Sequence, residues 1–482
     1  MTNWRASRPA VQPTSANHLT VTHPTFELPT APERNRFGWL LLAVVVAFLV
    51  VTQLVPYLSR PKDSKAGFER YETVLQSYIT QKEAMVSLSK MAGIAKPPNQ
   101  SALDETLEDS ISDLATLRLE SPDAARLYVA MRTELRVKIT PEDLGALRKE
   151  PTPRNKAFAK IYGEDKLSLE EAEAQSAWLD KDAFLDRLAL AHAREKAGAD
   201  NPRRELTDPH RAALLAVAGT AFAGALMLGM VLWPLYFGAR SAGRCKPLGH
   251  PVGTLSPAGA DRHAMRAAQI LLGMVLLSML LRPLLPDWPE WLDGPVFSAA
   301  MLGVVVLLAQ IPVWGLKISL GSIGIHRKNL GVNILWGIGG AIANVPMVLT
   351  LGVLGVEAFK FLPPPEHPSS SALMANPSVP MVLATLFSAS LMAPLIEETC
   401  FRGVLFPAIS TAFKHVPSGI LLSSLIFAAI HPTGIPAWPA LAAVGAMGAV
   451  LTYQTRSLVP AIVMHAVHNA GTLLLALSIA SR

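Results

Sequence analysis

The stretch VPMVLATLFSASLMAPLIEETCFR, residues 379–402, joins a membrane-length apolar run to two adjacent carboxylates and an arginine. A charged side chain in hydrocarbon costs roughly 2.5–3.5 kcal/mol, so an ionisable residue in a spanning helix marks a candidate functional site. On a helix Glu398 and Arg402 can pair on one face, while Glu397 points about 100° away. This spacing predicts one carboxylate held by arginine and one free for chemistry. In the alternative interpretation, residues 397–402 are a helix end whose charges reach water.

Two later apolar segments also carry polar residues at helical spacing. His431 lies one turn after Phe427, and His465 shares a helix face with Asn469. A lone histidine in an apolar helix is commonly a packed core residue. Polar groups on several spanning helices, however, avoid lipid by facing one another. We therefore expect the three segments to bring their polar side chains to one buried site.

These three motifs together resemble the signature of CPBP-type intramembrane proteases, which include type II CAAX prenyl endopeptidases and the Abi group. The resemblance is specific only between Pro394 and Asn469, and it rests on the order of the motifs and their spacing on successive apolar segments. The motifs are Glu397-Glu398-x-x-x-Arg402, Phe427-x-x-x-His431 and His465-x-x-x-Asn469.

The resemblance implies an endopeptidase that hydrolyses a peptide bond of a membrane-associated protein or peptide. Glu397 would act as the general base on a water that His431 orients. His465 and Asn469 would donate hydrogen bonds to the tetrahedral oxyanion.

The resemblance gives the remaining motif residues a supporting role, and it leaves the metal question open. Glu398 paired with Arg402 would hold the helix in register and tune the charge on Glu397. Zinc is the competing mechanism, because Glu397, His431 and His465 are acceptable zinc ligands and the family is often described as metalloendopeptidases. We favour the metal-free mechanism and expect no cofactor.

The composition predicts an all-α, polytopic transmembrane helix bundle. Half of the 482 residues (50%) are hydrophobic, and the mean hydropathy is +0.32. A spanning helix needs about 20 apolar residues, which gives about nine spans. They are predicted at residues 37–58, 212–236, 264–285, 296–316, 331–356, 379–396, 417–431, 437–453 and 458–478. The segment 417–431 is short, and the glycines at 337–340 indicate close helix packing.

Four regions follow from this pattern. Residues 1–36 are predicted to be a disordered tail, and residues 37–58 a retained signal-anchor helix. Residues 59–211 are rich in charge and lack a spanning run, so we expect a soluble helical domain. Residues 212–482 form the multi-span domain, which carries the protease-like motifs at 397–469.

Helical signals dominate the predicted soluble domain. Leu103, Leu107, Ile111 and Leu114 form an apolar stripe. Thr140 is predicted to cap a helix that begins at Pro141, and residues 168–171 form a capping box.

Short basic loops predict the orientation. The loop after Phe237 carries Arg240, Arg244 and Lys246, and a second basic loop follows residue 316. Counting spans from a cytoplasmic N-terminus puts both loops inside and the soluble insert outside. The same count predicts that Glu397 lies at the cytoplasmic end of its helix. We expect a multi-pass protein of the plasma (inner) membrane.

The sequence predicts three kinds of partner and leaves one alternative function open. The net charge of +6 resides mainly in the inside-facing loops, so no nucleic-acid partner is expected. The partners are the bilayer, a membrane-associated protein or peptide substrate, and a protein that binds the insert. The alternative is a non-catalytic membrane scaffold or bacteriocin-immunity-type protein that keeps the polar residues for packing.

Overall fold

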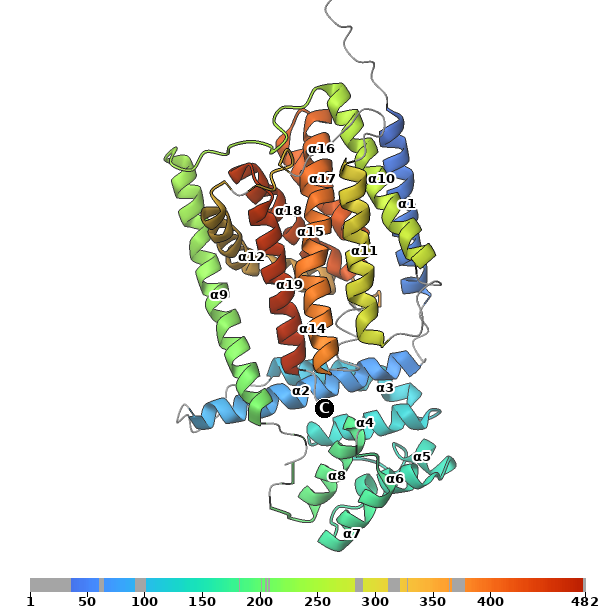
Figure 1. Ribbon diagram of the computed structural model, residues 1–482. Helices are drawn as coiled ribbons and strands as arrows, with labels where there is room; N and C mark the ends of the chain where they lie inside the picture. The colour runs from blue at the N-terminus through green and yellow to red at the C-terminus, as the bar shows by residue number, and fades with distance from the viewer. Residues whose placement is uncertain are drawn as a thin grey trace, which may run out of the picture. The chain divides into compact units, whose positions relative to one another are not determined.

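The computed structural model describes residues 36–59, 65–91, 101–181, 183–200, 202–203, 206, 209–281, 289–310, 321–326, 328–363, 365 and 378–479. Every regular element in these ranges is helical, which confirms the predicted all-α class (Figure 1). The predicted disordered tail, residues 1–36, lies outside the described residues except for its last position.

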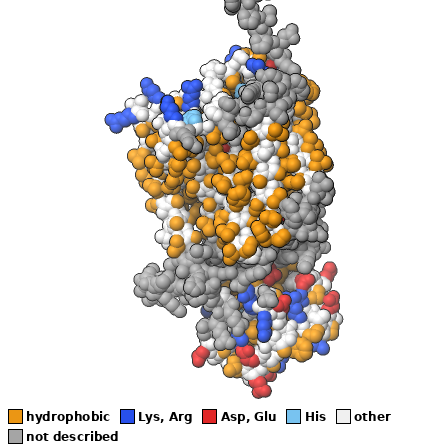
Figure 2. Space-filling model, viewed as in Figure 1, with side chains coloured by type: hydrophobic (Ala, Val, Ile, Leu, Met, Phe, Trp, Pro, Cys, Tyr) orange, Lys and Arg blue, Asp and Glu red, His pale blue; other side chains and the backbone are white. Residues whose placement is uncertain are grey.

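Eight helices in the described ranges are long and apolar enough to cross a membrane. Figure 2 shows that apolar side chains cover most of their described surface. They are α1 (Phe37–Leu58), α9 (Pro209–Ser241), α10 (Pro257–Leu281), α11 (Glu290–Gln310), α12 (Leu330–Ala358), the continuous helix 379–412, α18 (Trp438–Thr455) and α19 (Val459–Ile479). The ninth predicted span corresponds to α17 (Val416–Ala429), which is shorter. The chain is therefore a multi-pass membrane protein.

The helix that carries the two glutamates is longer than predicted. It runs without interruption from Val379 to Ala412 as α14 (Val379–Phe387), η3 (Ser388–Met392), α15 (Ala393–Glu398), η4 (Thr399–Leu405) and α16 (Phe406–Ala412). The predicted span 379–396 ended too early, and Glu397 lies in the middle of this helix. The helix does not have to emerge after Glu398, because this carboxylate is paired within the protein and residues 403–412 are again apolar.

Two π-helical turns interrupt the α-helical geometry of this long helix. Each precedes a proline, Pro394 after η3 and Pro407 after η4. Proline lacks an N–H and clashes with the carbonyl four residues earlier, and a wider turn relieves both problems. The π turn η4 directly follows the glutamates and contains Arg402, so it changes the direction of the Arg402 side chain relative to Glu398.

The helices between α1 and α9 have a hydrophobic core of their own. They are α2 (Lys65–Met91), α3 (Ser101–Leu117), α4 (Pro122–Glu134), α5 (Gly145–Lys149), α6 (Pro153–Gly163), α7 (Leu169–Ala174), η1 (Gln175–Trp178) and α8 (Phe184–Lys196). Leu107 and Leu114 of the predicted stripe are fully buried in this core, and Ile111 packs against it. The capping box at α7 is present, with Ser168 and Glu171 each accepting the other's backbone N–H.

The predicted helix start at Thr140 is wrong. Residues 141–144 form a turn, and α5 begins only at Gly145. The reason is Asp143, whose carboxylate accepts hydrogen bonds from both the backbone N–H and the hydroxyl of Thr140. Asp143 also pairs with Arg118 and Arg132, so it holds a turn where the sequence indicated a cap.

Glycines permit close packing among the membrane helices. A Cβ at Gly337 would lie 2.6 Å from Val463 of α19, and one at Gly340 would lie 2.6 Å from Leu451 of α18. A real Cβ does not approach neighbouring atoms so closely. Gly337 requires glycine, because the obstacles there include the Cβ of Val463 and the carbonyl oxygen of Pro460, whereas at Gly340 the side chain of Leu451 would have to move. The helix α12 therefore packs tightly against α18 and α19.

Candidate active site

Glu398 and Arg402 form a fully buried ion pair. Arg402 Nη1 lies 3.0 Å from Glu398 Oε1, and the two side chains are 1% and 0% exposed. Arg402 Nε donates to the carbonyl oxygen of Gly445 in α18, and the guanidinium lies 4.4 Å from the ring centroid of Phe427. The pairing expected from the i, i+4 spacing is present, and it also joins the helix 379–412 to α17 and α18.

His465 of α19 contacts the same carboxylate. Its Nδ1 lies 2.8 Å from Glu398 Oε1. Because a carboxylate only accepts, Nδ1 carries the proton in this contact. The other ring nitrogen, Nε2, lies 3.9 Å from Glu397 Oε2. Glu398 therefore orients the imidazole of His465 toward Glu397.

His431 is oriented in the same manner by the backbone. It lies just after the end of α17, and its Nδ1 donates to the carbonyl oxygen of Phe427 at 2.5 Å. Its Nε2 lies 3.6 Å from Glu397 Oε2. Phe427 is fully buried between Phe401, His431 and His465, so its ring supports both imidazoles.

Glu397 is the carboxylate at which these contacts converge. Its side chain is 21% exposed, and Oε2 is buried without a hydrogen bond among the described residues. The Nδ1 bonds of His431 and His465 leave the lone pairs of both Nε2 atoms facing this oxygen. Glu397 Oε2 and the two Nε2 atoms are all hydrogen-bond acceptors, so a hydrogen-bond donor must lie between them. This donor is either a water molecule or an additional proton on one imidazole.

Asn469 lies one turn after His465 on α19, and its amide anchors that helix. Asn469 Nδ2 donates to the carbonyl oxygen of Ala389 at 2.7 Å. Ala389 belongs to the π turn η3, whose geometry frees backbone carbonyls from regular α-helical bonds. The amide retains a second N–H, which leaves it one donor for other partners.

Two glycines of α18 border the cluster, and the sequence reading did not single them out. A Cβ at Gly448 would lie 3.0 Å from Glu398 Oε2, and a Cβ at Gly445 would lie 3.0 Å from Arg402 Nη2 and 2.9 Å from Ser424. Their i, i+3 spacing within an apolar segment was the available signal, since small residues mark close helix contacts in membranes.

The structure also locates the thiol of Cys400 and the three predicted zinc ligands. Cys400 is 1% exposed and lies in the core formed by α1, α10 and the helix 379–412. No group of three His, Cys, Asp or Glu side chains in the described ranges is arranged to hold a metal ion, and this includes Glu397 with His431 and His465.

The region that contains this cluster matches a known family. Residues 379–471 match the family model described as type II CAAX prenyl endopeptidase Rce1-like. The match covers the three motifs and agrees with the resemblance to CPBP/CAAX proteases that they indicated.

One curated protein of Escherichia coli is similar to part of the chain. It is described as an uncharacterized 24.3 kDa protein and is 31% identical over 125 residues, which cover 26% of this chain and 49% of the relative. The chain thus spans about half the length of this relative. No solved structure matches the chain.

Proposed function

We propose that the protein is an intramembrane endopeptidase that hydrolyses a peptide bond of a membrane-associated protein or peptide. The observation that carries the proposal is the convergence on Glu397 Oε2 of the Nε2 atoms of His431 and His465. Each imidazole is fixed through its Nδ1, so both present a defined ring nitrogen to one carboxylate. Such an arrangement suits the activation of a water molecule.

In the proposed reaction Glu397 removes a proton from a water that His431 orients. The resulting hydroxide attacks the carbonyl carbon of the scissile bond, and the carbonyl oxygen becomes an oxyanion. In this step His465 is the imidazole that carries the additional proton, and its Nε2–H and the free N–H of Asn469 stabilise the oxyanion by donating hydrogen bonds. The tetrahedral intermediate then collapses, the C–N bond breaks, and the protonated Glu397 gives its proton to the leaving amine.

The buried pair of Glu398 and Arg402 is assigned a positioning role. Glu398 holds the Nδ1 proton of His465, and Arg402 supplies the opposite charge beside this carboxylate. Arg402 also ties the pair to the backbone of α18 at Gly445. This arrangement fixes the direction of the His465 ring before substrate binds.

We also propose the topology that the basic loops indicate. The N-terminus is cytoplasmic, and the protein resides in the plasma (inner) membrane. Residues 59–211 form an extracytoplasmic helical domain that binds a protein partner. Arg240, Arg244 and Lys246, between α9 and α10, then face the cytoplasm, in agreement with the positive-inside rule.

Substrate trapping in native membranes tests the catalytic proposal. Membranes with the wild type, Glu397→Gln and His465→Ala are compared by quantitative proteomics, each with and without a chelator. The matched controls are Glu357→Gln and His415→Ala, because both residues are exposed and lie outside the cluster. We expect one membrane protein or peptide to accumulate uncut in the two site variants and to be cleaved with the wild type and controls.

The same experiment addresses the alternatives. Loss of cleavage on chelation would establish a metal requirement. If both site variants fold and the membrane proteome does not change, the non-catalytic scaffold becomes the better interpretation.

A further inference from the structure

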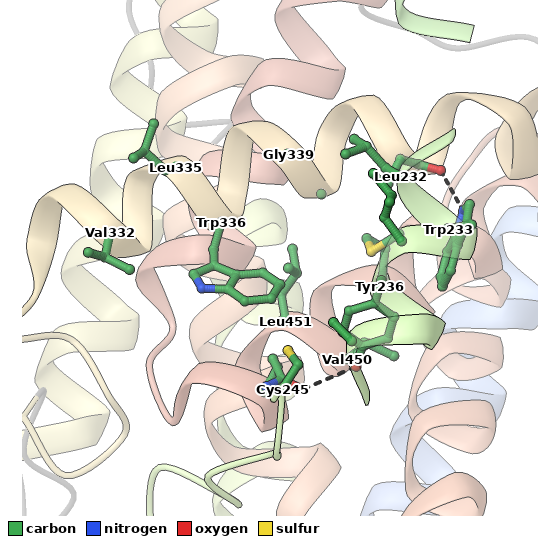
Figure 3. A pocket seen from close by; sticks show the side chains of 16 residues that line it. Leu232, Trp233, Tyr236, Cys245, Val332, Leu335, Trp336, Gly339, Val450 and Leu451 are labelled. Carbon is green, nitrogen blue, oxygen red and sulfur yellow. Dashed lines mark hydrogen bonds between the residues drawn. The ribbon is translucent and has the colours of Figure 1, made fainter. Parts of the chain in front are cut away.

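A second site lies between α9, α12 and α18. It is a cavity of about 500 Å³, within the usual size range of ligand pockets. Figure 3 shows Trp233 and Tyr236 from α9, Trp336 and Gly339 from α12, and Leu451 from α18 around it. Its walls are almost entirely apolar, and the polar side-chain atoms of Tyr236 and of Gln454 lie at one end.

This cavity is separate from the Glu397 cluster. On α18, Leu451 and Gln454 face the cavity, whereas Gly445 and Gly448 face Arg402 and Glu398. At about 100° per residue these two sets lie roughly 120° apart around the helix axis. The helix α18 therefore stands between the two sites.

The surroundings of the cavity determine the chemistry of its occupant. The helices α9, α12 and α18 are all long and apolar enough to span a membrane, so the cavity lies at membrane depth. An apolar space of this size is poorly suited to water, because water there finds few polar partners. A hydrocarbon chain matches both the lining and the surrounding medium.

One end of the cavity is polar and basic. Tyr236 Oη donates to Gln454 Oε1 at 3.1 Å, and Gln454 Nε2 donates to the carbonyl oxygen of Lys246 at 3.0 Å. Arg240 lies one turn after Tyr236 on the same face of α9, and Arg244 follows it. The side chains of Arg240, Arg244 and Lys246 are exposed, and residues 237–260 contain no Asp or Glu. Figure 2 shows a group of Lys and Arg side chains at this end of the apolar surface.

A second helix brings further positive charge to this end. Trp233 Nε1 of α9 donates to the carbonyl oxygen of Ala343, and the ring of Tyr236 contacts that of Trp336. The helices are therefore antiparallel, and the end of α9 lies near the start of α12, where Lys328 is exposed. An apolar chamber with basic residues at its interfacial end has the chemistry that recognises an anionic phospholipid.

We propose that this cavity binds one acyl chain of an anionic membrane phospholipid, with the phosphate held by Arg240, Arg244 and Lys246. The apolar walls select the chain, and the three cations select the headgroup. The site is independent of the proposed protease chemistry, because it shares no side chain with the Glu397 cluster.

Filling the cavity tests the acyl-chain part of the proposal. A Cβ at Gly339 would meet nothing within 4 Å, so Gly339→Phe projects into the open space of the cavity. Gly303→Phe in α11 is the matched control, since Gly303 is equally open and does not line the cavity. The purified full-length proteins are incubated with phosphatidylglycerol and examined by native mass spectrometry. We expect the wild type and Gly303→Phe to retain one lipid and Gly339→Phe to lose it. Equal retention by folded Gly339→Phe overturns the proposal.

Neutralising the basic end tests the headgroup part. Arg240→Gln, Arg244→Gln and Lys246→Gln are each expected to weaken phosphatidylglycerol binding about fivefold, with little change for phosphatidylcholine. Lys360→Gln is the control, because Lys360 follows the opposite end of α12. Wild-type protein that binds phosphatidylcholine as tightly as phosphatidylglycerol contradicts an anionic site.

Cys245 gives a measurement that needs no cavity-filling variant. It lines the cavity, whereas Cys400 is buried, so N-ethylmaleimide reports on Cys245. We expect phosphatidylglycerol to slow this modification severalfold in wild-type protein and to have no such effect in the Arg240/Arg244/Lys246 triple variant. An unchanged rate in the wild type refutes occupancy.

Discussion

His465 Nδ1 lies 2.8 Å from Glu398 Oε1, although 67 positions separate the two residues in the sequence. This contact joins α19 to the middle of the helix 379–412. Glu398 also pairs with Arg402, so one fully buried carboxylate holds two partners from two helices. The adjacent Glu397 is the carboxylate that both imidazoles face. In the proposed mechanism the two neighbouring glutamates therefore have different tasks, one structural and one chemical.

Glu398→Gln is expected to reduce both stability and activity. The amide preserves the shape of the side chain but removes its charge, which leaves Arg402 buried without a counter-ion. Breaking a buried ion pair in this manner costs about 3–5 kcal/mol. A lower midpoint of thermal unfolding in detergent, together with a loss of cleavage, checks this expectation. A midpoint equal to that of the wild type would show that the pair does not hold the helices together.

Glu397→Gln is expected to separate stability from activity. The side chain is partly exposed and has no hydrogen bond at Oε2 among the described residues, so its replacement removes little packing. Loss of a general base typically costs 10²–10⁴-fold in rate, and we expect a decrease of about that size with an unchanged unfolding midpoint. The measurement is cleavage of the trapped substrate by purified variants. Residual activity within a few-fold of the wild type contradicts the role assigned to Glu397.

Gly445→Ala is expected to disturb the site through α18. The new Cβ would lie 2.9 Å from Ser424 and 3.0 Å from Arg402 Nη2, so α18 must move away from the buried pair. Gly471→Ala in α19 is the control, because a Cβ there meets nothing within 4 Å and alanine favours the helix by about 1 kcal/mol. We expect Gly445→Ala to lower activity and thermal stability, and Gly471→Ala to leave both unchanged or slightly raised. Equal behaviour of the two variants rules out a packing requirement at Gly445.

The sequence identified the local geometry of the site better than its long-range contacts. The i, i+4 spacing of Glu398 and Arg402 was sufficient to predict their pairing, because helical periodicity alone brings them together. Nothing in the spacing indicated that His465 contacts Glu398, because this contact depends on how α19 is rotated against the helix 379–412. The sequence assigned His465 to the oxyanion, or to zinc in the competing mechanism, and both roles stay predictions.

Helix ends were predicted less well than helices. Hydropathy located the apolar segments, including the short α17. It placed a helix end after residue 396 because charges usually mark the membrane surface, whereas here Arg402 neutralises Glu398 within the helix. Thr140 shows the same limit in the region 59–211, where the carboxylate of Asp143 holds a turn that the N-cap pattern could not reveal.

We expect the stability of the helices between α1 and α9 to depend on pH through the titration of Glu134. This carboxylate is fully buried, with Oε1 at 2.9 Å from His192 Nε2 and 2.8 Å from Arg203 Nη2, and Oε2 at 3.2 Å from Lys82 Nζ. Burial alone raises the pKa of Glu134, but the hydrogen bond from His192 and the charges of His192, Arg203 and Lys82 together hold it well below its ordinary value. The folded state therefore binds this proton more weakly than the unfolded state does.

The sign of the effect follows from this depressed pKa. Above the ordinary glutamate pKa of about 4.3 the ionised Glu134 contributes its full stabilisation, and the contribution is lost as the pH falls toward the lower folded-state pKa. We expect urea resistance of α4 and α8 in the full-length protein, measured by pulsed hydrogen exchange, to decrease as the pH is lowered from 7 to 3. Glu134→Gln should be less stable at pH 7 and should show a flatter pH dependence. Glu142→Gln is the control, because that side chain is 69% exposed, and it should follow the wild type. Identical pH profiles for wild type and Glu134→Gln would exclude Glu134 as the titrating group, because the amide cannot ionise.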